Sequence, residues 1–412
     1  MKKRILALLI TAAMLGGLFA ACTDTTPPAP PLEEQEPDLV PASDLPLETP
    51  EAILAFSQAL FRGVLDLDNQ NPVISPLSAY YVLAMTALGA GGETAAEFQA
   101  LLGREPATLA RDLHALTASL SATNGGTDLN IAGGVWTDDT FTIHPEFAAL
   151  LEEYFDAPAE SLDFGDPETV RIINTWVYEQ THGLIEDFLS SISQNDMMLL
   201  VNTLYFRGQW AEAFHPMTAF DGMFYPADGI GVEAGFLSTH SVPLFVSVTD
   251  RYEAVSLPYD DDRLAFLLVR PTDRADVREF AASFDLAETL TSLEIHDSVQ
   301  VRMPMLDLTF ESELNLLLEQ MGLRSAFHDL AEFPDLTTGD ESLLITSVFQ
   351  KVRLLVDEEG TEAAAATGVM IGATSIDLNQ LNLTFDTPYL YVIYDMELGI
   401  PLFIGILENP AL

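Results

Sequence analysis

Cysteine and lysine are almost absent from this 412-residue chain. Cys22 is the single cysteine, which excludes an intramolecular disulfide and a cluster of thiolate metal ligands. Lys2, Lys3 and Lys351 are the only lysines, and the formal net charge is -46. Because a surface this acidic repels phosphate and sulfate groups, it excludes nucleic acid and heparin as partners, and also docking onto anionic lipid headgroups by charge.

The motifs of common catalytic sites are missing too. The chain has no G-x-S-x-G, Walker A or H-E-x-x-H sequence, and its seven histidines lie far apart. The glycine-rich stretch Gly89–Thr94 lacks the lysine and the preceding strand of a phosphate loop, so it predicts a turn between two helices. His144 and His182 are interpreted as residues at a helix start and a helix end. We therefore assign no catalytic residue, metal site or cofactor and do not expect an enzyme.

The first fifty residues predict an export signal followed by a tether. A basic start, Lys2–Arg4, precedes the apolar run Ile5–Ala21, as in a secretory signal, and the run is short for a membrane span. Its end, Leu18-Phe19-Ala20-Ala21-Cys22, resembles a bacterial lipobox, with Phe19 where Leu fits better; the alternative is an ordinary signal peptide. Residues 22–50 are rich in proline and acid and predict an extended tether. We expect an exported protein, a cell-envelope lipoprotein or extracellular, with a lipid on Cys22 as its only membrane contact.

From Glu51 to Leu412 the composition predicts one globular domain of the α+β class. Helices come first in the chain and most strands follow. The predicted helices are Glu51–Leu67, Pro76–Leu88, Glu93–Leu102, Pro106–Leu120 and Pro167–Gln180, the last with Asp166 as its cap. The predicted strands are Leu129–Trp136, Met198–Phe206, Ala254–Pro258 and Leu264–Val269, with a buried hairpin formed by Tyr389–Tyr394 and Ile400–Leu407.

One segment, Val356–Ser375, fits no single periodicity. It reads V-D-E-E-G-T-E-A-A-A-A-T-G-V-M-I-G-A-T-S. Every second residue from Thr361 to Ile371 is small or β-branched and uncharged, whereas the intervening set places its one charge, Glu362, on the opposite side. This alternation predicts a strand with one face in a tight interior. A solvated alanine-rich helix or a flexible loop is the alternative that four consecutive alanines favour.

The same segment resembles the reactive-loop hinge of an inhibitory serpin, and other segments agree with that family in order and spacing. The hinge residues are Glu358, Glu359, Gly360, Thr361, Glu362, Ala363, Ala364, Ala365, Ala366 and Thr367. The other matching segments are Asn71–Ser78, Leu129–Ala132 with Trp136, Asn174 with Thr181–Ile185, Asn202–Trp210, Leu314-Asn315, Met321-Gly322, Ala326-Phe327, Phe385, Pro388 and Asn409-Pro410. The resemblance spans Glu51 to Leu412.

The resemblance implies a fold of three β-sheets and about nine helices with an exposed reactive loop. It also implies a metastable, monomeric suicide inhibitor: a serine protease cuts the loop, is trapped as an acyl-enzyme, and the loop enters the main sheet. The alternative is a non-inhibitory relative that acts as a binding or carrier protein. The small-residue run Ala363–Gly368 is unbroken, which favours inhibition, because each inserted residue must fit between existing strands.

Counted along the loop as in the family, the scissile bond joins Thr374 to Ser375. The register is open by a residue or two, since Ala373 is equally small and the chain from Thr374 to Pro388 is longer than the family pattern. All these residues are small and uncharged, and no Lys or Arg lies between Gly360 and Pro388. The expected partner is therefore a serine protease with a small neutral primary pocket, of elastase or subtilisin type.

The resemblance further implies a polar group called the shutter and a tryptophan at the breach, where the loop enters the sheet. The shutter residues are Ser75, Ser78, Asn202 and Gln350, and the breach residue is Trp210. Two departures from the family pattern stand out. Gln350 replaces a usual histidine and removes a titrating group, and Met305 stands where a lysine often pairs with the hinge acid, here Glu358.

Overall fold

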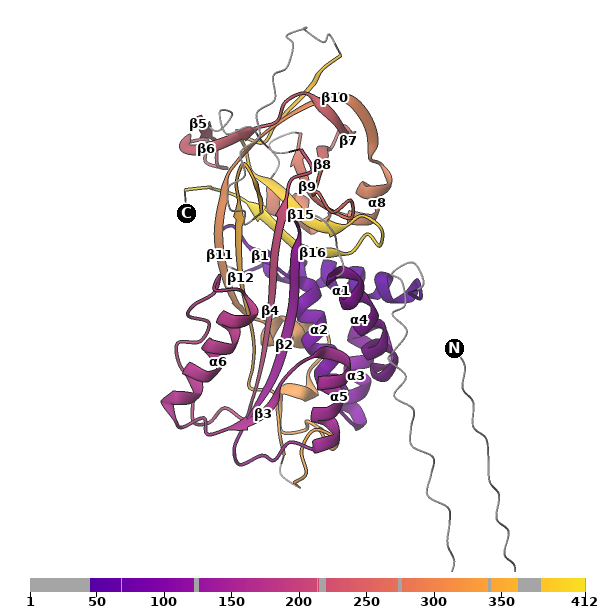
Figure 1. The fold of residues 1–412 in the computed structure, drawn as a ribbon, viewed down its shortest axis with the longest axis vertical. Coiled ribbons are helices and arrows are strands. Elements are labelled where there is room, and N and C mark those ends of the chain that lie inside the picture. Colours follow the sequence, from indigo (N-terminus) through magenta and orange to yellow (C-terminus); the bar gives the residue numbers. More distant parts are fainter. Residues whose placement is uncertain are drawn as a thin grey trace, which may run out of the picture. The chain divides into compact units, whose positions relative to one another are not determined.

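Two hydrogen-bonded sheets organise the residues that the computed structural model describes, which are 45–67, 69–121, 126–212, 214, 220–272, 276–339, 342–361 and 379–411. The first sheet has six strands in the order β11–β12–β13–β4–β2–β3. Its strands are β2 (Asp128–Asp138), β3 (Ala159–Leu162), β4 (Met198–Gln209), β11 (Leu306–Glu313), β12 (Ser347–Val356) and β13 (Gly360–Thr361). Figure 1 shows β4 and β2 side by side in this sheet.

The second sheet has ten strands. Nine follow the order β1–β16–β15–β9–β8–β7–β10–β6–β5, and β14 pairs with β10 off this path. Its strands are β1 (Val73–Ile74), β5 (Phe220–Phe224), β6 (Val232–Ser238), β7 (Val242–Val248), β8 (Tyr252–Pro258), β9 (Leu264–Pro271), β10 (Glu294–Pro304), β14 (Leu381–Thr384), β15 (Tyr389–Asp395) and β16 (Pro401–Leu407).

Three sheets were expected, and the structure has two, because two of the expected sheets are joined into the ten-stranded sheet by the hydrogen bonds of β10. The first part of β10, Glu294–Val299, pairs with β7, whereas Arg302–Pro304 pairs with β6. A break in register between His296 and Val299 separates these two parts. One long strand therefore joins β7 and its neighbours to β6 and β5 within a single ten-stranded sheet, as an irregularity in a ladder permits.

Helices cover the six-stranded sheet on both faces. Within the described residues the helices are α1 (Glu48–Leu65), α2 (Pro76–Ala87), α3 (Gly92–Leu102), α4 (Pro106–Ser121), α5 (Pro145–Phe155), α6 (Pro167–Gln180), α7 (Val277–Ala282), α8 (Leu286–Thr291) and α9 (Asn315–Gln320). Figure 1 shows α6 and the group of α2 to α5 on opposite sides of β2 and β4. None of the helices in this part of the chain is long and apolar enough to cross a membrane.

Alternation along the strands assigns side chains to the two faces. In β4, Leu200 belongs to the large core shared with α1 to α5, whereas Leu199 and Val201 pack with α6 residues in a second, smaller core. In β2, Val135 and Trp136 divide in the same way, and Trp136 packs edge-on against Trp176 of α6. Because both faces are buried, most residues of β4 from Met198 to Phe206 are apolar, with Asn202 and Thr203 between the two apolar stretches, which is why its position could be predicted.

Candidate functional site

The hinge of the predicted reactive loop is already part of the six-stranded sheet. β13 consists of Gly360 and Thr361 and lies between β12 and β4. Thr361 is antiparallel to both neighbours, opposite Val356 of β12 and Gly208 of β4. The resting structure therefore holds the start of an added central strand.

Gly360 is required by the closeness of two backbones at this point. A Cβ atom at Gly360 would lie 2.0 Å from the carbonyl oxygen of Gly208 and 2.9 Å from Cα of Gln209. Separations below about 3 Å force a backbone to move, so no other residue fits without displacing β13 from β4. The glycine in the hinge thus has a steric reason.

A tight acidic turn connects β12 to β13. The Asp357 carboxylate accepts hydrogen bonds from the backbone amides of Glu359 at 2.9 Å and Gly360 at 3.1 Å. Trp210 donates from its indole Nε1 to the Asp357 carbonyl at 3.0 Å and from its backbone amide to the Glu359 carbonyl at 3.1 Å. The predicted breach tryptophan therefore contacts the turn that leads into β13.

Thr361 is buried against an aromatic cluster. The residue is 1% exposed, and its hydroxyl lies 2.7 Å from the hydroxyl of Tyr259. Tyr259 stacks on Trp210 with ring centroids 4.8 Å apart and an interplanar angle of 8°. Burial raises the pKa of Tyr259 well above the usual value, so its hydroxyl keeps its proton at physiological pH.

The four predicted shutter residues meet in one buried hydrogen-bond network. Gln350 donates from Nε2 to the Ser75 carbonyl at 2.7 Å, to Asn202 Oδ1 at 3.0 Å and to the Ser78 hydroxyl at 3.2 Å. Its Oε1 accepts from the Ser75 amide at 3.1 Å, and the Ser78 hydroxyl donates to Asn202 Oδ1 at 2.8 Å. The network joins β12, β4 and the start of α2.

Below β13, β12 and β4 are in direct contact. They pair in parallel from Ser347 opposite Leu199 to Gln350 opposite Asn202. The Gln350–Asn202 hydrogen bond lies at the upper end of this contact, next to the opening that β13 occupies. A strand that enters between β12 and β4 as far as Gln350 and Asn202 must part these two side chains.

Lys351 connects β12 to two neighbouring segments on the face of the sheet opposite to Gln350. Its ammonium donates to the Asp187 carbonyl, in the segment between α6 and β4, at 2.6 Å and pairs with Glu311 of β11 at 2.6 Å. The sequence could have pointed to this residue, because Lys351 is the only lysine after residue 3.

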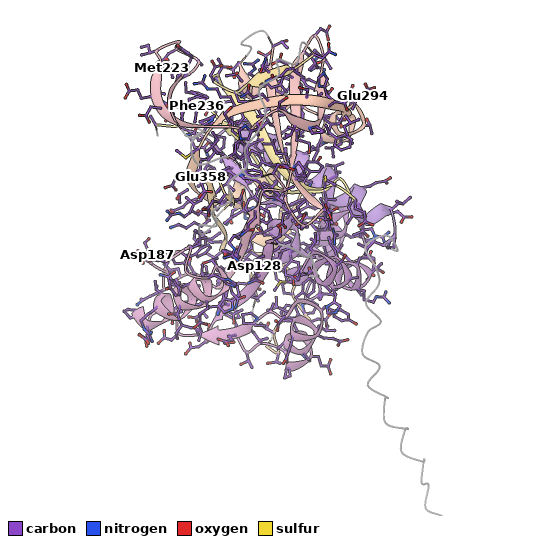
Figure 2. The ribbon with its side chains drawn as sticks, turned by 45° about the horizontal axis from the view of Figure 1, so that its top comes forward. Asp128, Asp187, Met223, Phe236, Glu294 and Glu358 are labelled. Atoms are coloured by element: carbon purple, nitrogen blue, oxygen red, sulfur yellow. The ribbon has the colours of Figure 1, made fainter. Side chains whose placement is uncertain are left out.

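Glu358 and Met305 stand out because the family often has, at the position of Met305, a lysine that pairs with the hinge acid. Among the described residues Glu358 has no ion pair, while its carbonyl accepts from the Phe214 amide at 3.1 Å. Met305 directs its thioether methyl to Gly235, where a Cβ atom would be 2.2 Å away. In the view of Figure 2, Glu358 is placed between Phe236 and Asp128.

Several predicted residues lie outside the described part of the chain. They are Cys22, Glu362, Ala363, Ala364, Ala365, Ala366, Thr367, Thr374 and Ser375. Sequence reasoning missed Tyr259 and Asp357 at the hinge, since Tyr259 is 102 residues away from Thr361. Within the described residues no group of three or more His, Cys, Asp or Glu side chains is arranged to hold a metal ion.

Comparison with known proteins agrees with this geometry. The family model "Serpin (serine protease inhibitor)" matches residues 51–410. Serpin-ZXA of Oryza sativa subsp. japonica is 31% identical over 370 residues, covering 83% of this chain and 91% of the relative. An uncharacterised serpin-like protein of Thermococcus kodakarensis is 30% identical over 367 residues, covering 87% and 85%.

Solved structures show the same fold. The native state of the thermophilic serpin tengpin superposes with a TM-score of 0.81 at 28% identity, over 87% of this chain and 94% of that one. Thyroxine-binding globulin in complex with thyroxine has a TM-score of 0.78 at 21% identity, over 88% of this chain and 99% of that one, and so shows the fold alone. The inserted hinge, the buried polar network and these matches agree: the chain belongs to the serpin family.

Proposed function

We propose that this serpin is an irreversible suicide inhibitor of serine proteases, consistent with a family whose members are typically protease inhibitors and not enzymes. The observation that carries the proposal is β13, a short strand that starts between β12 and β4 at the hinge of the reactive loop. A loop whose first residues already pair with both neighbours needs only to continue in the same direction. The small residues that follow Thr361 in the sequence suit a strand between two others.

The proposed mechanism needs no catalytic residue in the serpin. The protease's serine attacks the carbonyl carbon of Thr374, the bond to the Ser375 nitrogen breaks, and the released amine takes a proton from the protease's histidine. The loop, joined to the protease as an ester, then enters the sheet. At roughly 3.3 Å per residue, insertion of some fifteen residues moves the ester about 50 Å. Distortion of the trapped protease prevents hydrolysis of the ester.

The target is proposed to be a protease with a small neutral primary pocket. Incubation with an elastase and with subtilisin is expected to give a complex that survives denaturant, together with a cleaved serpin of higher thermal stability. Trypsin serves as the control, because no Lys or Arg lies between Gly360 and Pro388. Cleavage by both neutral-pocket proteases without such a complex, and without a gain in thermal stability, would favour a binding or carrier protein instead.

We also propose that the protein is exported and held at a membrane by a lipid on Cys22. The Pro-rich residues 22–44, which precede the buried residue Leu45, would let the domain reach roughly 70 Å from the anchor at about 3.1 Å per residue. Anchoring would confine inhibition to proteases that approach the cell surface.

A Cys22→Ser variant of the full chain tests the anchor. In a bacterial host, the unchanged chain is expected to incorporate labelled fatty acid and to sediment with membranes, whereas Cys22→Ser incorporates no label. Because Cys22 is the only cysteine, no other thiol confuses the label. An unlabelled parent chain, or a Cys22→Ser chain that still incorporates the label, contradicts the proposal.

A further inference from the structure

We infer that Tyr259 is a positioning residue for the hinge, which its hydroxyl holds in the sheet before any protease cuts the loop. The inference rests on the proposed inhibitory function and adds a regulated step to it. The uncut loop then exchanges between two states, with the hinge inserted as in this structure or expelled from it. The Tyr259–Thr361 hydrogen bond sets the ratio of the two states.

The Tyr259 hydroxyl is fixed in position by the packing of its ring. The residue is fully buried, its ring stacks on Trp210, and its edge meets Phe206 with centroids 5.0 Å apart at 74°. Its backbone amide donates to the Leu264 carbonyl at 2.9 Å. Because neither the ring nor the backbone is free to move, Thr361 must come to the hydroxyl, and it does so only when the hinge is inserted.

An opposing contribution comes from the acidic turn, so a single hydrogen bond is able to shift the balance. Asp357, Glu358 and Glu359 are consecutive, and Oε2 of Glu359 is buried without a hydrogen-bond partner among the described residues. Glu358 has no ion pair among those residues. Like charges brought together and a buried, unpaired oxygen both favour expulsion of the turn into solvent.

Hinge position affects the two stages of inhibition in opposite ways. An inserted hinge draws the loop toward the sheet and leaves less chain free to enter a protease's active site, which slows association. After cleavage, however, the same hinge has already begun the added strand, so insertion outruns hydrolysis of the acyl-enzyme. Loss of the hydrogen bond should therefore speed association and also raise the number of serpin molecules consumed per protease inhibited.

The first test needs no protease. Hydrogen exchange followed by mass spectrometry on the full chain would monitor the backbone amides of Trp210 and Phe214, which donate to the carbonyls of Glu359 and Glu358. Tyr259→Phe and Thr361→Val each remove one hydroxyl with little change of shape. Each is expected to raise exchange at these amides about fivefold to tenfold, the contribution of one buried hydrogen bond.

The double variant and a matched control make this test decisive. Once one hydroxyl is gone the second has no partner, so the double variant should exchange no faster than the faster single variant. Tyr391→Phe is the control, since Tyr391 is fully buried and its hydroxyl has no hydrogen-bond partner among the described residues; its exchange at Trp210 and Phe214 should match the parent chain. Unchanged exchange in either single variant, or additive effects in the double, overturns the inference.

A second test uses the elastase identified as a target. Tyr259→Phe should show a higher association rate constant and a higher stoichiometry of inhibition than the parent chain and Tyr391→Phe. If both quantities stay at the parent values, the inference fails although the inhibitor proposal stands. If the parent chain forms no stable complex, the inhibitor proposal fails. The hydrogen-exchange experiment still decides whether Tyr259 holds the hinge in the sheet.

Discussion

A Thr361→Arg variant is expected to be cleaved by the target protease as an ordinary substrate, with the yield of stable complex reduced at least about a hundredfold. Thr361 is 1% exposed and faces the Tyr259 hydroxyl within an aromatic cluster. A guanidinium placed there loses its hydration, and the carboxylate of Asp261 near Tyr259 already accepts hydrogen bonds from the backbone amides of Arg263 and Leu264. The cost of about 3 kcal/mol or more corresponds to that factor and applies to the first residue that must enter the sheet.

The measurement is the fraction of protease converted into a complex that survives denaturant, at several ratios of serpin to protease. Thr361→Val controls for the lost hydroxyl and keeps the size of the side chain. Leu330→Arg controls for the added charge, because Leu330 is 75% exposed. A complex yield for Thr361→Arg equal to that of Leu330→Arg would show that the hinge need not enter the sheet.

The second large effect is expected at Gln350, where substitution by glutamate should lower stability by about 3 kcal/mol at pH 7. The side chain is 3% exposed, and its Nε2 donates to the Ser75 carbonyl and to Asn202 Oδ1. In Gln350→Glu a carboxylate oxygen takes the place of this donor and faces the same two acceptors. The variant keeps the shape of the side chain, so the loss measures the hydrogen bonds and the buried charge.

The pH dependence of two Gln350 variants should have opposite signs. Burial raises the pKa of a glutamate at this position above about 4.3, so Gln350→Glu is most stable below that pH and loses stability as the pH rises through the raised value. Burial lowers the pKa of a histidine there below about 6.5, so Gln350→His is most stable above pH 6.5 and loses stability as the pH falls.

Guanidinium unfolding between pH 4 and 8 would measure both slopes. The parent chain supplies the baseline, because Gln350 has no titrating group and contributes no slope of its own. Equal pH profiles for the parent chain and both variants would mean that the site is hydrated and that the network does not hold β12 to β4.

Local chemistry made many elements predictable. The predicted cap Asp166 accepts from the Glu168 amide at 2.9 Å, and the proposed C-terminal hairpin is β15 and β16, buried along its whole length. The turn expected at Gly89–Thr94 is found at residues 88–91, because Gly92–Thr94 already form the start of α3, and His144 accepts from the Glu146 amide at the start of α5. In each case a proline, a cap, a group of glycines or an apolar run carries the information within a few residues.

The contacts of the hinge with distant residues could not be predicted from the sequence alone. Its alternation predicted a strand with one buried face, but not that Thr361 is paired before cleavage, because that depends on Tyr259 and Gly208 far away in the chain. The shutter residues were identified through resemblance, and only the structure shows that Gln350 makes hydrogen bonds with both its amide oxygen and its amide nitrogen. Contacts between distant segments follow from the assembled sheet.

The pairing of β12 with β4 has a mechanical consequence. At their direct contact Gln350 is opposite Asn202, and at the hinge Val356 and Gly208 are both opposite Thr361. The two strands keep one lengthwise alignment through both regions, although they are adjacent in the first and separated by β13 in the second. For a new strand to insert, β12 and β4 must therefore move apart sideways by one strand spacing, about 4.8 Å, without sliding along each other.

Because the strands do not slide, the final position of each loop residue follows from Thr361. The inserted strand is antiparallel to both neighbours, so a loop residue six positions after Thr361 is opposite residues six positions before Val356 and Gly208. Thr367 is therefore expected to arrive between Asn202 and Gln350. There its hydroxyl would take over the hydrogen bond that now joins the two amides. Insertion would then change the width of the sheet and preserve its alignment.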